Sequence, residues 1–325
     1  MRQDICITVA LPLTQAQSET LRAAAPQAVF RFLAPENVRE EDVRDAQVLI
    51  GKIPPSVCAA APRVRWYQAA AAGPDAYLKP GVFAPEVTVT TAVGAYGPAV
   101  SEHLFAMTLA VLKHLPAYRD AQRTHIWKNL GTTGTMAGAN VLVLGAGDIG
   151  GSYAVLCHAL GARVVGIRRH PEAAPGGMWD AQAAPDALDR LLPEADVVAL
   201  FLPGGSGTYH LLDARRIALM KKGAVLVNGG RGTAVDTDAL TAALRTGSMG
   251  GAALDVTDPE PLPPGHPLWD MENVLITPHA AGGFSLPQTL DRIVEIAADN
   301  LRRYLAGEPL HNVVERGTLE KGEKE

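Results

Sequence analysis

Three polar side chains in the second half of the chain, Arg231, Glu260 and His279, each follow a short apolar run. An arginine can hold a carboxylate through two parallel hydrogen bonds and can also polarise a carbonyl oxygen. A histidine can deliver a proton near neutral pH, and a carboxylate on its far ring nitrogen would favour the imidazolium form. Together they suit the reduction of a 2-oxo acid by hydride transfer, which needs a clamped carboxylate, a polarised carbonyl group and a proton for the developing alkoxide.

A glycine-rich motif lies upstream, at Gly145-Ala146-Gly147-Asp148-Ile149-Gly150. It follows the apolar strand pattern at 141–144 and precedes a helical pattern, which is the setting of a dinucleotide-binding G-x-G-x-x-G. There the first glycine permits a tight turn, the second lets the backbone approach a pyrophosphate and the third allows close helix–strand packing. The helix start adds amide donors for the phosphates. We therefore predict a dinucleotide site, for which a purely structural glycine turn is the alternative.

Each catalytic candidate also has an ordinary explanation. An arginine at a strand end is most often a surface ion-pair partner, and a glutamate in a proline-rich loop is usually solvated. The Pro278-His279 pair in a glycine-rich loop could be a simple turn. Their occurrence in this order, downstream of the glycine motif, favours the catalytic interpretation.

The residues about twenty positions after the glycines bear on the choice of cofactor. An NAD-preferring site carries an acidic residue there, which accepts hydrogen bonds from the ribose hydroxyls. This chain has Arg168 and Arg169 at the end of the strand pattern 164–167. An arginine lacks that acceptor and attracts a 2′-phosphate instead. We expect a preference for NADP(H), with NAD(H) possible. The alternative is that both arginines are solvated and discriminate weakly.

The apolar patterns place all these residues at strand ends of an α/β fold. In the first part of the chain, strands are predicted at 5–11, 28–33, 46–50, 63–68 and 87–91, with a helix at 14–25 capped by Thr14. In the second part, strands are predicted at 141–144, 163–167, 196–202, 224–228, 251–255 and 273–276, with helices at 99–115, 213–220 and 236–246 among them. Alternating strands and helices predict parallel sheets covered on both faces, with ligands bound outside the carboxyl ends of the strands.

Two domains follow from this order. The boundary falls at Gly97-Pro98, since proline suits the first turn of a helix. A long amphipathic helix over 285–306, ended by Gly307, remains after six strands of the second domain are placed, and we expect it to return to the first. The predicted domains are therefore residues 1–97 with 285–325, and residues 98–284.

Composition excludes several other classes of protein. The net charge of −5 over 325 residues gives no reason to expect nucleic acid or an anionic membrane as a partner. Three scattered cysteines, without a C-x-x-C pair or metal-ligand spacing, fit a reducing cytoplasm and no metal site. The longest strongly apolar run, 104–112, has about half the length of a membrane-spanning helix. We expect a soluble cytoplasmic protein.

The motifs together resemble the D-specific 2-hydroxyacid dehydrogenase family, which includes glyoxylate/hydroxypyruvate reductases and phosphoglycerate dehydrogenases. The motifs that carry the resemblance are Val100-Ser101-Glu102-His103, the G-x-G-x-x-G, Asn228-Gly229-Gly230-Arg231-Gly232, Glu260-Pro261-Leu262 and Thr277-Pro278-His279. The resemblance implies the catalytic roles given above. It also implies a flavodoxin-like substrate domain and a Rossmann dinucleotide-binding domain, which close over the substrate in the cleft between them.

Further residue roles come from the resemblance alone. Asp255 would lie near the nicotinamide carboxamide, and Pro203 would line the cofactor cleft. Ala72 and Gly73 would offer backbone amides to the substrate carboxylate. Their loop departs from the commoner Gly-x-Gly-x-Asp form of the family, so a plain turn is the alternative there.

The resemblance also implies a homodimer, because family members commonly associate through the helix that starts at Pro98. Trp127 occupies a place where the family often has a tryptophan. A packing role fits this residue better than contact with the substrate.

Three functions remain open on these grounds. The leading one is an NADPH-dependent reductase of a small 2-oxo acid such as glyoxylate or hydroxypyruvate. A second keeps the chemistry but acts on a bulkier 2-oxo acid or on 3-phosphoglycerate. Phosphoglycerate would need further cationic side chains near the substrate. The sequence offers Lys52, Arg63, Arg65 and Lys79, but it does not show where these side chains point. The third is a dinucleotide-sensing binding protein, like the C-terminal-binding-protein corepressors. The lack of a long disordered tail counts against it.

Overall fold

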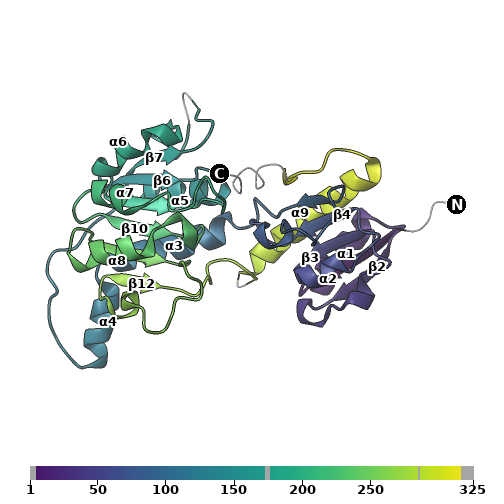
Figure 1. Cartoon of the computed structure of the whole chain (residues 1–325), viewed down its shortest axis with the longest axis horizontal. Helices are drawn as coiled ribbons and strands as arrows, with labels where there is room; N and C mark the ends of the chain where they lie inside the picture. Colours follow the sequence, from purple (N-terminus) through teal and green to yellow (C-terminus); the bar gives the residue numbers. More distant parts are fainter. Residues whose placement is uncertain (1–4, 173–175, 285, 316–325) are drawn as a thin grey trace. The chain divides into compact units, whose positions relative to one another are not determined.

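The computed structural model describes residues 5–172, 176–284 and 286–315, which divide into two compact units (Figure 1). The first unit comprises the chain up to Tyr96 together with the part from Gly283 onward, and the second comprises Gly97–Gly282. Ser285 and the tail from residue 316, both assigned above to the first domain, lie outside the described residues. Both units are α/β folds built on parallel sheets, as predicted.

The first unit holds a five-stranded parallel sheet in the order β2-β1-β3-β4-β5, the flavodoxin-like order. Its strands are β1 (Cys6–Ala10), β2 (Val29–Leu33), β3 (Val48–Gly51), β4 (Trp66–Ala69) and β5 (Thr88–Thr90). Its α-helices are α1 (Gln15–Ala24), α2 (Pro55–Ala59) and α9 (Pro287–Ala306). All five strands fall within the predicted ranges to within one residue.

Local signals set the ends of the longer helices. The Thr14 hydroxyl accepts a hydrogen bond from the Gln17 amide and the Gln17 side chain bonds back to the Thr14 amide, so the predicted cap is confirmed as a capping box. Helix α9 ends at Gly307, whose φ of 72° is left-handed. Helix α9 packs against α1 and stacks its Tyr304 ring on Trp66 of β4 at 5.2 Å, beside the strands of this unit in Figure 1.

The second unit holds a seven-stranded parallel sheet in the order β12-β11-β10-β9-β6-β7-β8. Its strands are β6 (Asn140–Leu144), β7 (Arg163–Ile167), β8 (Ala181–Ala183), β9 (Val197–Leu200), β10 (Val225–Asn228), β11 (Gly251–Leu254) and β12 (Val274–Ile276). This is the Rossmann order with one added strand. The sequence patterns missed β8, because a three-residue edge strand of alanine and glutamine carries no β-branched or aromatic residue.

The helix predicted over 99–115 is wrong at its end. Helix α3 (Gly97–Leu112) stops before His114, which has a left-handed φ of 55°, and α4 (Leu115–Arg123) begins immediately afterwards. Pro116 lies in the first turn of α4, where its missing N–H leaves no hydrogen bond unmade. The remaining α-helices of this unit are α5 (Asp148–Ala159), α6 (Leu188–Leu191), α7 (Ala214–Leu219) and α8 (Thr237–Arg245).

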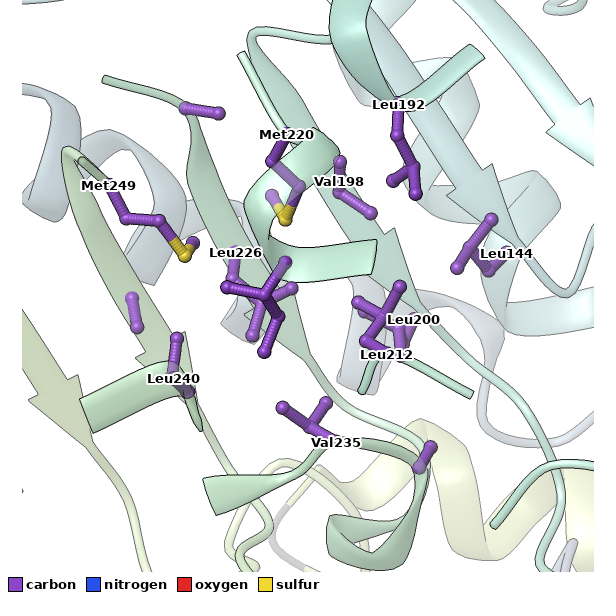
Figure 2. Packing of buried hydrophobic residues seen from close by; sticks show 14 of the residues in the cluster. Leu144, Leu192, Val198, Leu200, Leu212, Met220, Leu226, Val235, Leu240 and Met249 are labelled. Atoms are coloured by element: carbon purple, nitrogen blue, oxygen red, sulfur yellow. The ribbon is translucent and has the colours of Figure 1, made fainter. Parts of the chain in front are cut away.

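A hydrophobic core covers one face of this sheet (Figure 2). Leu144, Val198 and Leu226 come from β6, β9 and β10, and Leu240 of α8 packs among the same group. Each of these side chains is at most 1% exposed. Burying a side chain of this size stabilises the fold by roughly 1.5–3 kcal/mol. The core therefore holds the strands firmly, and the loops at their carboxyl ends are placed by a rigid sheet.

Candidate active site

The glycine-rich loop joins β6 to α5 with the geometry that a dinucleotide needs. Gly145 has a φ of +98°, and a Cβ there would lie 2.6 Å from the Phe201 carbonyl oxygen. A Cβ on Gly150 would overlap the Gly145 carbonyl, so only glycine allows α5 to pack this closely. Beside Gly147, the N-cap of α5, an added Cβ would meet nothing within 4 Å. The loop thus leaves room for phosphate oxygens beside the first-turn amides of α5.

Strand order supports a cofactor site at this loop. β6 and β9 are neighbours at the point where the order of strands reverses, which is where doubly wound sheets bind ligands. Pro203, the predicted cleft residue, follows β9 and is exposed. The Thr208 hydroxyl donates to the Pro203 carbonyl at 2.8 Å and so fixes this second loop.

Arg168 and Arg169 follow β7 directly, as predicted. The Arg168 amide donates to the Ala183 carbonyl of β8 at 3.0 Å, so the overlooked strand holds the backbone that carries the arginine. The Arg168 guanidinium bonds to the Glu172 carboxylate at 3.1 Å, with side chains 39% and 62% exposed. An ion pair this exposed is worth at most about 1 kcal/mol. A doubly charged phosphate could therefore displace Glu172 from the arginine.

Arg231 follows β10 and is held through its backbone by Asn228, the last residue of that strand. The buried Asn228 side chain donates to the Arg231 carbonyl at 3.0 Å and accepts from the Gly230 amide at 3.1 Å. The Arg231 guanidinium donates to the Gly230 carbonyl at 2.9 Å. Next to it, a Cβ on Gly232 would overlap the backbone of the β11 loop at Thr257. Sequence patterns had given Asn228 no role, yet it orients the loop.

The structure joins Glu260 and His279. The histidine Nδ1 lies 2.8 Å from a Glu260 carboxylate oxygen, with side chains 50% and 45% exposed. With Glu260 on Nδ1, the ring can present Nε2 to a ligand. The His279 backbone has a left-handed φ of 51°, and its amide donates to the Asp255 carbonyl at 2.8 Å. Arg231, Glu260 and His279 thus follow β10, β11 and β12, three neighbouring strands of one sheet.

The loop that carries the histidine is anchored by a buried carboxylate. Asp255 is 3% exposed, and its Oδ1 accepts from the Thr277 hydroxyl at 2.5 Å and from the Ala280 amide at 2.8 Å. The Thr277 oxygen also lies 3.0 Å from His103 Nε2 of α3. Asp255 therefore positions the loop, whatever contact it makes with a cofactor. In the sequence, His103 is marked only by its place in the Val100-Ser101-Glu102-His103 motif, for which no role was predicted.

Ala72 and Gly73 lie in the first unit, after β4. Within the described part of the chain, neither of their amides donates a hydrogen bond. The preceding residue pair is held, since the Tyr96 hydroxyl donates to the Ala70 carbonyl and the Ala92 amide to the Ala71 carbonyl. Two open amides at a carboxyl strand end are compatible with the predicted anion contact.

Other predictions concerned absences and one tryptophan. Among the described residues there is no group of three or more histidine, cysteine, aspartate or glutamate side chains that could hold a metal ion. No described helix has the length and apolar character needed to cross a membrane. Trp127 is 103% exposed, so the predicted packing role is wrong within its own chain.

Comparisons with known proteins identify the family of the chain. Residues 105–281 match the family model for the NAD-binding domain of D-isomer specific 2-hydroxyacid dehydrogenases. The chain is 33% identical over 284 residues to a glyoxylate reductase from Thermofilum pendens, covering 84% of this chain and 80% of that protein. It is 33% identical over 289 residues to D-3-phosphoglycerate dehydrogenase from Mycobacterium leprae, covering 89% of this chain but only 51% of that enzyme.

A solved structure covers nearly the whole chain. It is the NADPH-dependent glyoxylate/hydroxypyruvate reductase from Sinorhizobium meliloti, in complex with NADP and sulfate. Its TM-score to this chain is 0.81 at 26% identity, covering 97% of this chain and 99% of that one. The chain therefore belongs to the D-isomer specific 2-hydroxyacid dehydrogenase family and is an NAD(P)-dependent dehydrogenase of 2-hydroxy acids.

Proposed function

We propose that this protein is an NADPH-dependent reductase of a small 2-oxo acid of the glyoxylate or hydroxypyruvate type. The observation that carries the proposal is the 2.8 Å bond between His279 Nδ1 and Glu260, which follow the two strands next to the strand of Arg231. Relatives named as glyoxylate reductases support the substrate class.

The three residues divide the work in this proposal. Arg231 binds the substrate carboxylate through its planar fork of N–H groups and polarises the neighbouring carbonyl oxygen. His279 donates a proton from Nε2 to the oxygen as negative charge develops there. Glu260, on the opposite ring nitrogen, orients the imidazole and stabilises its charged form. A bound nicotinamide supplies the hydride. Ala72 and Gly73 add two amide donors for the carboxylate.

Binding of 3-phosphoglycerate is a weaker candidate. Its phosphate would need cations near the substrate carboxylate loops, which follow the carboxyl ends of the strands. Arg63 and Arg65 instead precede β4, at the amino end of the sheet. Two of the four cations considered for this substrate therefore lie on the wrong edge.

The first experiment is a matrix of initial rates. NADPH and NADH are each paired with glyoxylate, hydroxypyruvate, pyruvate, phenylpyruvate and phosphohydroxypyruvate. The proposal expects the fastest turnover for glyoxylate or hydroxypyruvate with NADPH. Fastest turnover of phenylpyruvate or phosphohydroxypyruvate would replace the substrate class. No turnover, together with a raised melting temperature in NADPH, would indicate a dinucleotide sensor.

Arg168 is proposed as the residue that reads the 2′-phosphate of the cofactor. Arg168→Asp should lower the ratio of kcat/KM for NADPH to that for NADH about a hundredfold. A charged hydrogen bond worth about 1.5–3 kcal/mol is lost, and the new carboxylate repels the phosphate and can accept from the ribose hydroxyls. Measuring kcat/KM with both cofactors gives the ratio.

Glu172→Gln is the matched control for that substitution. It removes the carboxylate that bonds Arg168 and leaves the arginine in place. NADPH should then bind a few-fold more tightly, since an exposed pair contributes at most about 1 kcal/mol. An unchanged cofactor ratio in Arg168→Asp would mean that this arginine does not contact the phosphate.

Thr277 is expected to act as a positioning residue, because its hydroxyl bridges Asp255 and His103. Thr277→Val keeps the shape of the side chain but removes a hydrogen bond to a buried carboxylate, worth about 1.5–3 kcal/mol. We expect kcat to fall roughly tenfold, with little change in KM for NADPH. Thr277→Ser should restore most of the rate. A normal kcat in the valine variant would show that these two hydrogen bonds of Thr277 do not control the position of His279.

We also propose that the protein is a homodimer. Leu115 of α4 and the following residues Ile126 and Trp127 are 52%, 56% and 103% exposed. Large apolar side chains on one segment are typical of an association surface. The molar mass in solution tests this directly.

A further inference from the structure

A depression of about 340 Å³ opens where the strands of the five-stranded sheet begin, at their amino ends. Its lining residues are Ile5, Gln47, Pro62, Arg63, Arg65 and Tyr304. Ile5, Gln47 and Arg65 directly precede β1, β3 and β4, which are neighbours in the sheet. The candidate substrate loop at Ala72 and Gly73 follows β4 at its other end. The depression is therefore separate from the substrate loop of the same unit.

The polar groups that line the depression are rich in hydrogen-bond donors. The Gln47 side-chain oxygen already accepts from the Cys6 amide at 3.0 Å, which leaves the two hydrogens of its amide nitrogen for a ligand. Arg63 and Arg65 each carry five N–H donors, and the Tyr304 hydroxyl can donate as well. Among the lining residues that the structure describes there is no aspartate or glutamate.

The two arginines have no close acidic partner within the described ranges. None of the carboxylates there lies within 4.0 Å of either guanidinium group. The pKa of Asp45 is lowered mainly by a hydrogen bond from Arg31, at 3.1 Å. The charge of Arg63 lowers this pKa less. Two arginine side chains thus line one depression, and the positive charge that they bring there favours an anion.

The walls of the depression are fixed by the core of the unit. The Tyr304 ring stacks on Trp66, which is fully buried and donates from its indole nitrogen to Thr90 at 2.8 Å. The Arg65 amide donates to the Gln47 carbonyl at 2.8 Å. A ligand would meet backbone positions that the sheet and α9 already hold, which reduces the entropy lost on binding.

We propose that this depression binds a small phosphate-bearing anion, as a second site apart from catalysis. Two guanidinium groups, an amide nitrogen and a hydroxyl offer more donors than the two oxygens of one carboxylate can accept, and a phosphate group has three terminal oxygens. The volume lies at the lower end of the range for small-molecule sites, about 300–1,000 Å³. The inference does not depend on the proposed substrate or cofactor preference.

The test is calorimetric titration of inorganic pyrophosphate into the full-length protein saturated with NADPH. Saturation fills the phosphate-binding loop and occupies Arg168, so that pyrophosphate cannot report on them. The variants are Arg63→Ala/Arg65→Ala and, as a matched loss of charge in the same unit, Arg44→Ala, an exposed arginine outside the lining. Arg231→Ala controls for binding at the candidate active site. Tricarballylate serves as a carboxylate probe of similar charge.

We expect one pyrophosphate per chain, with affinity at least tenfold weaker in the double variant and within twofold of wild type in Arg44→Ala and Arg231→Ala. The double variant should keep wild-type kcat, since neither arginine belongs to the catalytic set. Arg63→Ala alone should bind pyrophosphate a few-fold more weakly than the wild type. Because Arg63 lies in an exposed loop, this single variant replaces the double variant in the test if the double variant does not fold. The proposal is overturned by absent binding, by equal weakening in Arg44→Ala, by unchanged affinity in the double variant, or by tighter binding of tricarballylate.

Discussion

Arg231→Ala should lower kcat/KM for the 2-oxo acid about a thousandfold. Removing one partner of a hydrogen-bonded charge pair typically costs about 2–5 kcal/mol, and here the partner left behind is the substrate carboxylate. The same guanidinium also polarises the carbonyl group that accepts the hydride, which adds to the loss. Steady-state rates with glyoxylate and hydroxypyruvate measure the effect.

NADPH affinity provides the control for this substitution. Arg231 follows β10, whereas the glycine loop and Arg168 follow β6 and β7, so the dissociation constant for NADPH should stay within about twofold. Arg231→Lys should recover only part of the rate, because an ammonium group cannot make the parallel pair of hydrogen bonds. A near-normal rate in the alanine variant would remove Arg231 from the role of clamp.

His279→Asn should reduce kcat by about 10²–10⁴-fold, the usual contribution of a positioned proton donor. Asparagine is the replacement that the backbone suggests. His279 has a left-handed φ of 51°, a conformation that asparagine adopts more readily than other residues with a side chain. The loop should therefore keep its bonds to Asp255 while losing the imidazole. Single-turnover rates separate this loss in chemistry from any change in product release.

Glu260→Gln tests whether the carboxylate acts through the histidine. The amide oxygen of glutamine can still accept from Nδ1, so the ring stays oriented while the negative charge is lost. We expect a smaller loss of kcat than in His279→Asn. In the double variant the two effects should not add, since residues that act as a unit show strong coupling. Additive losses would assign Glu260 a role independent of His279.

Much of the fold follows from short-range patterns. Runs such as Val141 to Leu144 predicted strands because a strand buried on both faces needs consecutive apolar residues. Thr14 and Gly307 marked helix ends because a capping hydroxyl and a left-handed glycine act within a single turn. The tight turn at Gly145 follows from the same kind of local requirement.

The local patterns failed where several conformations suit the same residues. Helical spacing continues through residues 99–115, but the chain leaves the helix at His114 and starts a new one at Leu115. Strand β8 has three residues of weak strand preference, and it forms because its backbone pairs with β7. In both cases contacts with other elements outweigh local preference.

For the site, the residue types and their order along the chain predicted the chemistry, since the need for a carboxylate clamp and a proton donor can be recognised from individual side chains. Three-dimensional contacts determined how those side chains are held. The His103–Thr277 bond joins residues 174 positions apart, and the depression beside Arg65 collects residues from three strand starts and a distant helix. Periodicity describes only near neighbours along the chain, so such contacts arise when the sheet and its helices pack.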